Sequence, residues 1–235
     1  MKFQNYKIIG LGLTLAILLI AGTIWLNTDS KQDSQKKTTV LKSLEIREYE
    51  GINLSSINDF RENSIKGPQR VNKDDYRLKI TGLVEESKIY TYDEVINNHQ
   101  HYKKVVSLDC VEGWSAKILW EGILVKDLIN QSKPLSNAKI IIFHAHDGYT
   151  TSFPIDYVMK NDIMMAYKMN NVTLPPERGF PFELVAESKW GYKWIKWITE
   201  IELSADTTYR GYWEKRGYSN DCSLDKDFIE KYRKE

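Results

Sequence analysis

The chain has 235 residues, of which 42% are hydrophobic and 28% are charged, and its formal net charge is +1. This composition is typical of a globular protein that buries a core without disulfide bonds, and the neutral balance argues against a nucleic-acid partner. The two cysteines, Cys110 and Cys222, are too few for a disulfide scaffold or a clustered-cysteine zinc site, while a single bridge between them stays open.

The chain begins with a pattern typical of a membrane anchor. Residues 8–26 contain no charged side chain, and about 20 apolar residues suffice to cross a bilayer as a helix. Trp25 lies at the end of this run, where aromatic residues meet the membrane interface. A cleaved signal peptide is the alternative, but the small residues at 21–23 make a poor cleavage site. We therefore expect a short tail at 1–7 and a transmembrane helix at 8–26.

The polar segment that follows the apolar run, residues 27–42, has little to bury and predicts a flexible tether. A short tail before the anchor and a large domain after it favour a domain outside the cytoplasm. The expected localisation is the cell membrane, with a single span and an extracytoplasmic domain at 43–235.

The domain at 43–235 mixes strands and short helices without regular alternation, which predicts the α+β class rather than a doubly wound sheet. Thr91 and Glu94 form a capping box at the start of one helix. In chain order we expect a strand at 76–84, a helix at 91–98, a strand at 105–108, a helix at 125–131, a strand at 138–143, a turn at 147–148, and strands at 182–186 and 194–203.

A cysteine motif directly follows the predicted strand at 105–108 and reads Cys110-Val111-Glu112-Gly113-Trp114-Ser115. A cysteine between a strand end and a glycine turn is placed to face a cleft, where its thiolate can be a nucleophile or a ligand for a soft metal. A buried structural thiol is the alternative, because free cysteine is among the most buried residue types. Cys222, near the C-terminus, is interpreted as a peripheral or weakly buried thiol.

A second segment, residues 189–197, combines three lysines and four aromatic residues around Gly191. Backbone amides near a glycine, flanked by lysines, can hold a phosphate, and flat rings can border a planar heterocycle. The alternative is an amphipathic strand whose lysines face water. His144 and His146 would point to the same side of a strand, but no third zinc ligand is evident.

Taken in order, these segments resemble the sulfite oxidase superfamily, in particular its molybdopterin-binding oxidoreductase domain and, within it, the bacterial periplasmic methionine sulfoxide reductases. The resemblance runs from about residue 55 to about residue 219. Its specificity comes mainly from the motif at 110–115 followed by Gly-Tyr-Lys-x-x-Lys at 191–196. Further matching segments lie at 58–62, 76–84, 120–122, 147–149, 179–182 and 211–214.

The resemblance implies a mixed, β-rich α+β fold around one molybdenum held by a single pyranopterin dithiolene. It implies that Cys110 is the catalytic residue and the thiolate ligand of the metal, a pairing that suits a soft ligand. It also implies cofactor contacts, with Lys196 as the charge on the phosphate. The positions that match the family's cofactor-binding segments are Asn58, Arg61, Glu62, His146, Arg178, Trp194, Ile195 and Lys196.

Glu183 departs from the family pattern, because many members have at this position an arginine that contacts the cofactor. A carboxylate cannot act as the partner of a phosphate, so another cation would have to compensate. The candidates in the sequence are Lys189, Lys193 and Arg178.

The implied reaction is two-electron redox with oxygen-atom transfer on a small substrate. Sulfite oxidation needs several arginines over the metal, and no arginine lies between Arg77 and Arg178, so a sulfoxide or N-oxide is favoured. Without a Cys-x-x-Cys-His motif, electrons are expected from a separate haem or quinone-linked protein. Two alternatives stay open: a tethered binding module without metal, and a cysteine enzyme with Cys110 as nucleophile and His144 or His146 as base.

Overall fold

The computed structural model describes residues 44–229 of the chain. All the sheets of the described residues lie in one compact unit that begins at Glu45. The predicted anchor at 8–26 and tether at 27–42 lie outside the described residues. Within residues 44–229, no helix combines the length and the apolar character needed to cross a membrane.

The first of two five-stranded sheets has the strand order β10-β9-β6-β5, with β11 also paired to β9. Every pair in this sheet is antiparallel. Its strands are β5 (Tyr102–Asp109), β6 (Ser115–Leu124), β9 (Met164–Met169), β10 (Val172–Thr173) and β11 (Glu183–Val185).

The second five-stranded sheet has the order β4-β3-β12-β7-β8, in which β12 is parallel to β3 and the other pairs are antiparallel. Its strands are β3 (Leu78–Gly82), β4 (Lys88–Tyr90), β7 (Ile140–Ala145), β8 (Thr150–Pro154) and β12 (Ile198–Ser204). A separate hairpin pairs β1 (Glu48–Tyr49) with β2 (Ile52–Asn53).

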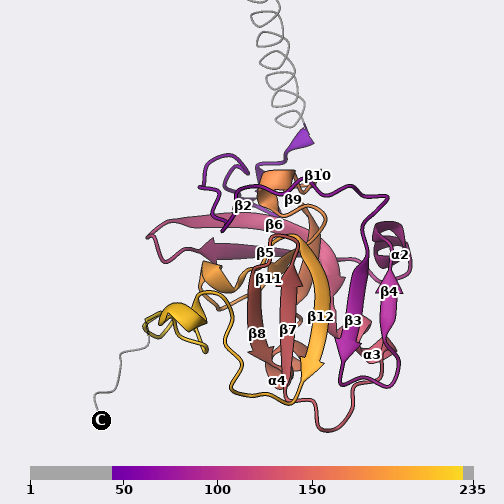
Figure 1. Ribbon diagram of the computed structural model, residues 1–235. Coiled ribbons are helices and arrows are strands. Elements are labelled where there is room, and N and C mark those ends of the chain that lie inside the picture. The colour runs from indigo at the N-terminus through magenta and orange to yellow at the C-terminus, as the bar shows by residue number, and fades with distance from the viewer. Residues whose placement is uncertain (1–43, 230–235) are drawn as a thin grey trace, which may run out of the picture. The chain divides into compact units, whose positions relative to one another are not determined.

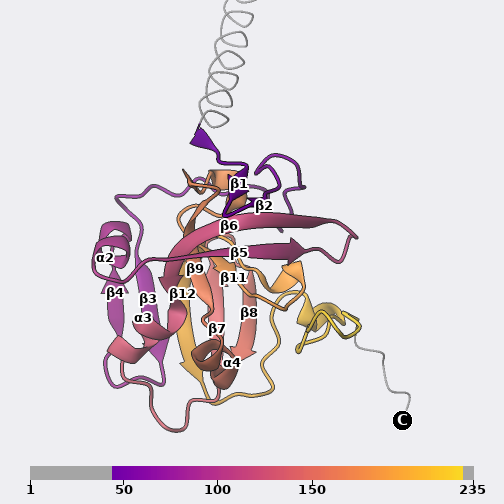
Figure 2. The same cartoon turned by 180° about the vertical axis from the view of Figure 1, so that it is seen from behind.

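The two large sheets cross each other, because β5 and β6 run across the direction of β7, β8 and β12 when seen from either side (Figures 1 and 2). Strand β6 is buried over its last seven residues. At its bulge, Gly122 allows β9 to come close, because an added Cβ would overlap the carbonyl oxygen of Met165. The long β5–β6 hairpin is therefore held firmly by its neighbours.

The helices are short and connect the strands. Helix α2 (Tyr92–Asn97) has the predicted capping box between Thr91 and Glu94, and α3 (Val125–Gln131) occupies the predicted residues. Helix α4 (Ile155–Lys160) follows β8. Three 3-10 turns complete the set: η1 (Pro176–Arg178), η2 (Gly191–Lys193) and η3 (Glu214–Arg216). The mixture of sheets and short helices confirms the α+β class.

Several predictions from local pattern differ from the structure. The strand predicted at 194–203 begins only at Ile198, because Trp197 has a φ of 56° and cannot continue an extended strand. Strands β6 and β9 are buried on both faces and so lack the alternation that would reveal them. The prediction that Cys222 is peripheral is wrong, since this residue is 0% exposed. Both cysteines are free thiols.

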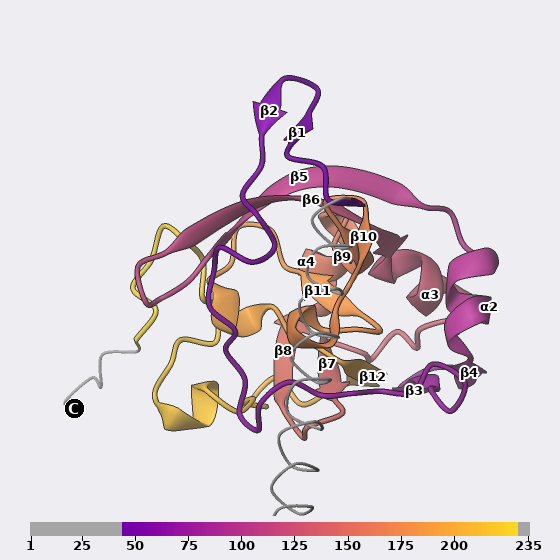
Figure 3. The same ribbon diagram turned by 90° about the horizontal axis from the view of Figure 1, so that it is seen from above.

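The chain after β12 returns to the hairpin. In Figures 1 and 3 the turn between β5 and β6 lies beside the C-terminal segment drawn in yellow. Trp213 and Tyr218 of this segment line the same cavity as Cys110 of the turn. Residues more than 100 positions apart in the sequence thus meet at one site.

Candidate active site

Cys110 lies in the turn of the β5–β6 hairpin. The last residue of β5, Asp109, is paired with the first of β6, Ser115. The amide of Cys110 donates to the carbonyl of Trp114 at 2.9 Å, and the amide of Gly113 donates to the carbonyl of Cys110 at 3.0 Å. Gly113 has a φ of 85°, a conformation that favours glycine. The thiol faces a cavity, as the strand end and the glycine predict.

The Cys110 thiol is 8% exposed, and its sulfur lies 3.8 Å from the side-chain amide nitrogen of Asn63. Burial raises the pKa of the thiol, and the Glu112 carboxylate adds to this effect. The backbone amide of Glu112 and the side chain of Asn63 act in the opposite direction. Without a cation beside it the sulfur is therefore a protonated thiol, whereas a coordinated metal would hold it as a thiolate.

The turn η2 closes the cavity from the other side and packs on the hairpin. A Cβ added at Gly191 would lie 3.2 Å from the Asp109 carbonyl oxygen and 3.6 Å from the Cys110 Cα. Trp194, just after this turn, donates from its indole to the carbonyl of Lys189 at 2.9 Å. Its ring packs on buried Trp120, with 5.7 Å between the ring centroids. The glycine-centred motif and the cysteine motif are thus adjacent in space.

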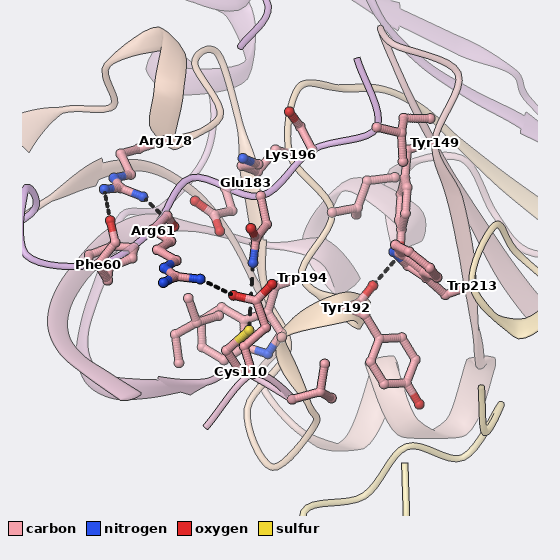
Figure 4. Close-up of a pocket in the computed structure, with 18 of the residues that line it drawn as sticks. Phe60, Arg61, Cys110, Tyr149, Arg178, Glu183, Tyr192, Trp194, Lys196 and Trp213 are labelled. Carbon is pink, nitrogen blue, oxygen red and sulfur yellow. Dashed lines mark hydrogen bonds and ion pairs between the residues drawn. The ribbon is translucent and has the colours of Figure 1, made fainter. Parts of the chain in front are cut away.

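The cavity between these segments has a volume of about 290 Å³, close to the lower end for small-molecule and cofactor sites. Two groups of lining residues can be distinguished, and Figure 4 shows Arg61, Arg178, Glu183 and Lys196 of the first apart from Tyr149, Tyr192 and Trp213 of the second. One, named here the charged wall, consists of Arg61, Glu112, Arg178, Glu183 and Lys196. The other, the aromatic wall, consists of Tyr149, Tyr192, Trp213 and Tyr218.

Arg178, on the charged wall, holds the chain segment opposite it. Its guanidinium donates to three backbone carbonyls, those of Ile57, Phe60 and Arg61, at 2.9, 2.6 and 3.1 Å. The guanidinium carbon also lies 3.8 Å from the centroid of the Phe60 ring. These contacts order the segment that carries Arg61 and Glu62 into the site, so most of Arg178's donors are committed to the protein itself.

Lys196 is the second cation of the charged wall. Its ammonium lies 2.6 Å from a carboxylate oxygen of Glu62 and 4.4 Å from the centroid of the Trp197 ring. The Lys196 side chain is 13% exposed, and that of Glu62 is 24% exposed. The pair is therefore partly open to the cavity.

Glu183 begins β11 and is 5% exposed. Burial raises the pKa of its carboxyl to about 8, although the nearby charges of Lys196 and Arg178 act to lower it. At neutral pH most of the molecules thus carry an uncharged carboxylic acid at position 183.

The two other lysines of the glycine-centred motif do not face the cavity. Lys193 is 0% exposed, and its ammonium lies 2.6 Å from Glu214, 2.8 Å from the Ser152 carbonyl and 3.1 Å from the Asn220 side chain. Lys189 pairs with Asp221 at 3.0 Å. The expectation that Lys189 or Lys193 compensates for Glu183 is wrong, as is the alternative of a strand with solvated lysines.

The aromatic wall is built where the C-terminal segment meets η2. The rings of Trp213 and Tyr218, and those of Tyr192 and Tyr218, have centroids 5.1 Å apart. The Tyr149 hydroxyl donates to the carbonyl of Tyr192. The contacts between these rings give the cavity a firm apolar side, away from the charged wall.

The structure brings most of the predicted site residues together. Cys110, Arg61, Arg178, Trp194, Ile195 and Lys196 line the cavity, and Glu62 contacts it through Lys196. Asn58 is exposed outside the lining, and His146 is exposed in a different, open depression that also includes Arg70 and Arg77. Lining residues absent from the prediction include Asn63, Ser64 and Trp213. Trp213 belongs to the matching segment at 211–214, and Asn63 and Ser64 directly follow the one at 58–62, so their place in the sequence could have identified them.

Neither His144 nor His146 lies where it could act as a base for a nucleophilic Cys110. His144 contacts Glu202 at 2.9 Å on the second sheet. No histidine is among the described residues that line the cavity. Within residues 44–229, no group of three or more His, Cys, Asp or Glu side chains is arranged to hold a metal ion. The cysteine-enzyme alternative therefore lacks its expected base.

Residues 65–213 match the model of the oxidoreductase molybdopterin binding domain family. The chain belongs to this family, within the sulfite oxidase superfamily, and it is a molybdopterin-binding oxidoreductase. The sulfane dehydrogenase SoxCD from Paracoccus pantotrophus has a similar fold, with a TM-score of 0.57 and 22% identity over 60% of this chain and 41% of that one.

Three curated proteins are similar in sequence. The uncharacterized oxidoreductase YuiH of Bacillus subtilis (strain 168) is 29% identical over 144 residues, which are 61% of this chain and 72% of that protein. The putative protein-methionine-sulfoxide reductase subunit YedZ1 of Azospira oryzae is 31% identical over 144 residues, 61% and 54% of the two chains. The NADPH nitrate reductase of Fusarium oxysporum is 27% identical over 164 residues, 59% and 18% of the two chains.

The cavity suits the cofactor that the family implies. Cys110 offers one soft sulfur ligand on the cavity surface, and Lys196 offers a cation for a phosphate. The Ser64 hydroxyl, also on the lining, is buried without a hydrogen-bond partner. A buried polar atom of this kind is normally satisfied, so a polar ligand in the cavity accounts for it. The residues present therefore fit a molybdenum-pterin.

Proposed function

We propose that this chain is a membrane-anchored, extracytoplasmic molybdenum-pterin oxidoreductase in which Cys110 is the protein's ligand to the metal. The observation that carries the proposal is the position of the Cys110 sulfur, on a cavity of about 290 Å³ between a charged and an aromatic wall. The family match supports the cofactor. The apolar run at 8–26 supports the anchor.

The proposed cofactor carries one pterin dithiolene per molybdenum. Lys196 holds its phosphate, Trp194 and Ile195 border the pterin, and the Arg178 contacts fix the segment with Arg61 and Glu62 against it. Asn58 and His146, which lie outside the lining, are assigned no direct contact. When bound, the cofactor supplies two-electron redox chemistry with oxygen-atom transfer, and the protein supplies orientation, a thiolate and a cavity of limited access.

The proposed substrate is a small sulfoxide or N-oxide rather than sulfite. Of the two arginines on the charged wall, Arg178 is committed to backbone carbonyls, and Arg61 lies 3.9 Å from the Glu112 carboxylate. This leaves little positive charge for a dianion, which would also meet Glu112. The aromatic wall offers an apolar surface that suits an uncharged substrate.

We also propose that electrons come from a separate haem or quinone-linked protein. The sequence contains no Cys-x-x-Cys-His haem motif of its own. A membrane anchor would keep the domain close to such a partner. The Azospira oryzae relative is named a reductase subunit, which agrees with electron supply by a second chain.

The test is to make the full chain in a host that synthesises molybdopterin and to measure molybdenum and pterin per chain. We expect about one of each in the wild type, a large loss of molybdenum in Cys110→Ala, and wild-type content in Cys222→Ala. The wild type should then reduce a panel of sulfoxides and N-oxides with an artificial electron donor and leave sulfite unoxidised. Well-folded wild-type protein without molybdenum would contradict the proposal and favour the metal-free binding module.

A further inference from the structure

Glu183 is a buried carboxyl on the cavity wall, and within residues 44–229 its carboxyl group has no hydrogen bond or ion pair. It is 5% exposed and lines the cavity beside Lys196, to which its backbone is bridged. Among the described residues, none offers its carboxyl a hydrogen bond or an ion pair. Buried polar groups normally have partners, so the partner of this one is to be sought in the cavity.

The charged groups around Glu183 are already committed elsewhere. Lys196 is paired with Glu62 at 2.6 Å, and the donors of Arg178 bind three backbone carbonyls. Burial lowers the pKa of Arg178, while the charges of Glu183, Glu62 and Glu177 act to raise it, so Glu183 shares this guanidinium with two other carboxylates. Across the cavity, Arg61 is near Glu112 at 3.9 Å. Because an ionised carboxylate would be buried here without a donor, the neutral acid is the favoured form.

A neutral carboxylic acid has an O–H donor, which an ionised carboxylate lacks. Building on the proposed function, we propose that neutral Glu183 donates a hydrogen bond to the phosphate monoester held by Lys196. The proton stays on the carboxyl oxygen, and a phosphate oxygen accepts. Loss of that proton removes the donor and places a negative charge next to the phosphate. Deprotonation of Glu183 therefore turns an attractive contact with the phosphate into a repulsive one.

A hydrogen bond from Glu183 differs in its pH dependence from the contact that an arginine would make at this position. An arginine offers an anion a charge at every accessible pH, whereas Glu183 offers a donor only while protonated. Burial raises the pKa of Glu183 to about 8, so the donor is present at neutral pH. Anion binding in this cavity should consequently weaken as the pH rises through that value.

The test uses the cofactor-free full chain and sulfate, a tetrahedral dianion whose charge does not change between pH 6.5 and pH 9. Sulfate affinity is measured by calorimetry at both pH values at constant ionic strength. For the wild type we expect binding about tenfold weaker at pH 9, because about one molecule in ten keeps the Glu183 proton one unit above its pKa. Glu183→Gln, a permanent donor, should bind equally well at both pH values.

The matched control is Glu112→Gln, another carboxyl of the charged wall. The side-chain donor of Trp114 and that of Asn63 hold the pKa of Glu112 below its ordinary value, so this residue is ionised at both pH values. Its replacement should leave the pH effect intact, while Lys196→Ala should abolish sulfate binding throughout. Equal wild-type affinities at the two pH values, no sulfate binding at pH 6.5, or an unchanged pH effect in Glu183→Gln would overturn the inference.

A second measurement separates this inference from the proposed function. Full-length protein loaded in a molybdopterin-producing host is dialysed at pH 6.5 and at pH 9, and the pterin left per chain is measured by fluorescence. We expect greater loss at pH 9 in the wild type than in Glu183→Gln. Equal retention in both proteins would reject the role of Glu183 alone. A wild type that never contains pterin would reject the proposed function, while the sulfate measurement would still test Glu183.

Discussion

Lys193 and Lys196 are three residues apart in one motif, yet they belong to two regions of different character. Lys193 is 0% exposed in a polar cluster with Glu214, and every donor of its ammonium has a partner: Glu214, the Ser152 carbonyl and Asn220. Lys196 is on the charged wall, close to Glu183, whose carboxyl has no donor among the described residues. The ion pair between buried Lys193 and Glu214 stabilises the fold. Glu183, in contrast, can accept a ligand as its hydrogen-bond partner.

The polar cluster around Lys193 also has a role in the site, although it touches no part of the cavity. It joins η2, which packs on Cys110, to β8 through the Ser152 carbonyl and to the C-terminal segment through Glu214. That segment supplies Trp213 and Tyr218 of the aromatic wall, and η2 supplies Tyr192. The cluster therefore positions one whole side of the cavity, and its loss should affect the fold before it affects the chemistry.

The largest effect is expected from Lys193→Ala, which leaves the Glu214 carboxylate buried without its cation. We expect the free energy of unfolding of the cofactor-free protein to fall by about 3–5 kcal/mol, measured by urea denaturation. Lys196→Ala is the matched control: its partner Glu62 keeps a 24% exposed side chain that water can reach, so the substitution should cost less, about 1–2 kcal/mol. Equal costs for the two substitutions would remove the distinction between the two regions.

The second effect concerns the pH dependence of stability through Glu183. Its pKa is 4.5 in a reference state and about 8 in the folded protein, so between these values the folded state binds a proton that the unfolded state has lost. The contribution of Glu183 to the free energy of unfolding is therefore fully present below pH 4.5 and is lost progressively as the pH rises to about 8. We expect a loss of about 2–4 kcal/mol between pH 5 and pH 9, and a flatter profile in Glu183→Gln. A profile unchanged by this substitution would show that the folded carboxyl titrates normally.

A smaller effect is expected from Gly211→Ala, next to the polar cluster. An added Cβ would overlap the carbonyl oxygen of Thr150 and lie 2.6 Å from a carboxylate oxygen of Glu214. The crowding should cost about 1–3 kcal/mol, seen as a lower urea midpoint. Gly51→Ala is a control for the removal of a glycine without crowding, because no atom lies within 4 Å of a Cβ there. Its φ of 77° gives it a backbone penalty of its own, so a Gly211→Ala cost below that of Gly51→Ala would contradict the packing argument.

The smallest effect is expected from Thr151→Val. The buried Thr151 hydroxyl donates to Glu214 at 2.9 Å, and the replacement keeps the shape of the side chain while it removes this one hydrogen bond. We expect a loss of about 1 kcal/mol. Thr208→Val, which removes an exposed hydrogen bond to Asp206, should be close to neutral in the same measurement. A neutral Thr151→Val would mean that Lys193 alone suffices for the Glu214 oxygen that both side chains contact.

Sequence patterns predicted the secondary structure correctly where residues close together in the chain determine it. The capping box of α2 and the bounds of α3 follow from side chains a few residues apart. The place of Cys110 between a strand and a glycine turn follows from its immediate neighbours. Strands β6 and β9 escaped prediction because both faces are buried, and the strand predicted at 194–203 was too long because Trp197 has a positive φ.

By itself, the sequence determined the class of the fold, the thiol at the strand end, and the membership of a family whose motifs lie in a recognisable order. The tertiary structure alone decided which lysine of one motif faces the cavity, and that Cys222 is buried. It also decided that no residue in the described part of the chain donates to the carboxyl group of Glu183. The physical reason is that these properties depend on charges and carbonyls contributed by distant segments. Lys193 meets Ser152 and Glu214, and no spacing along the chain encodes that meeting.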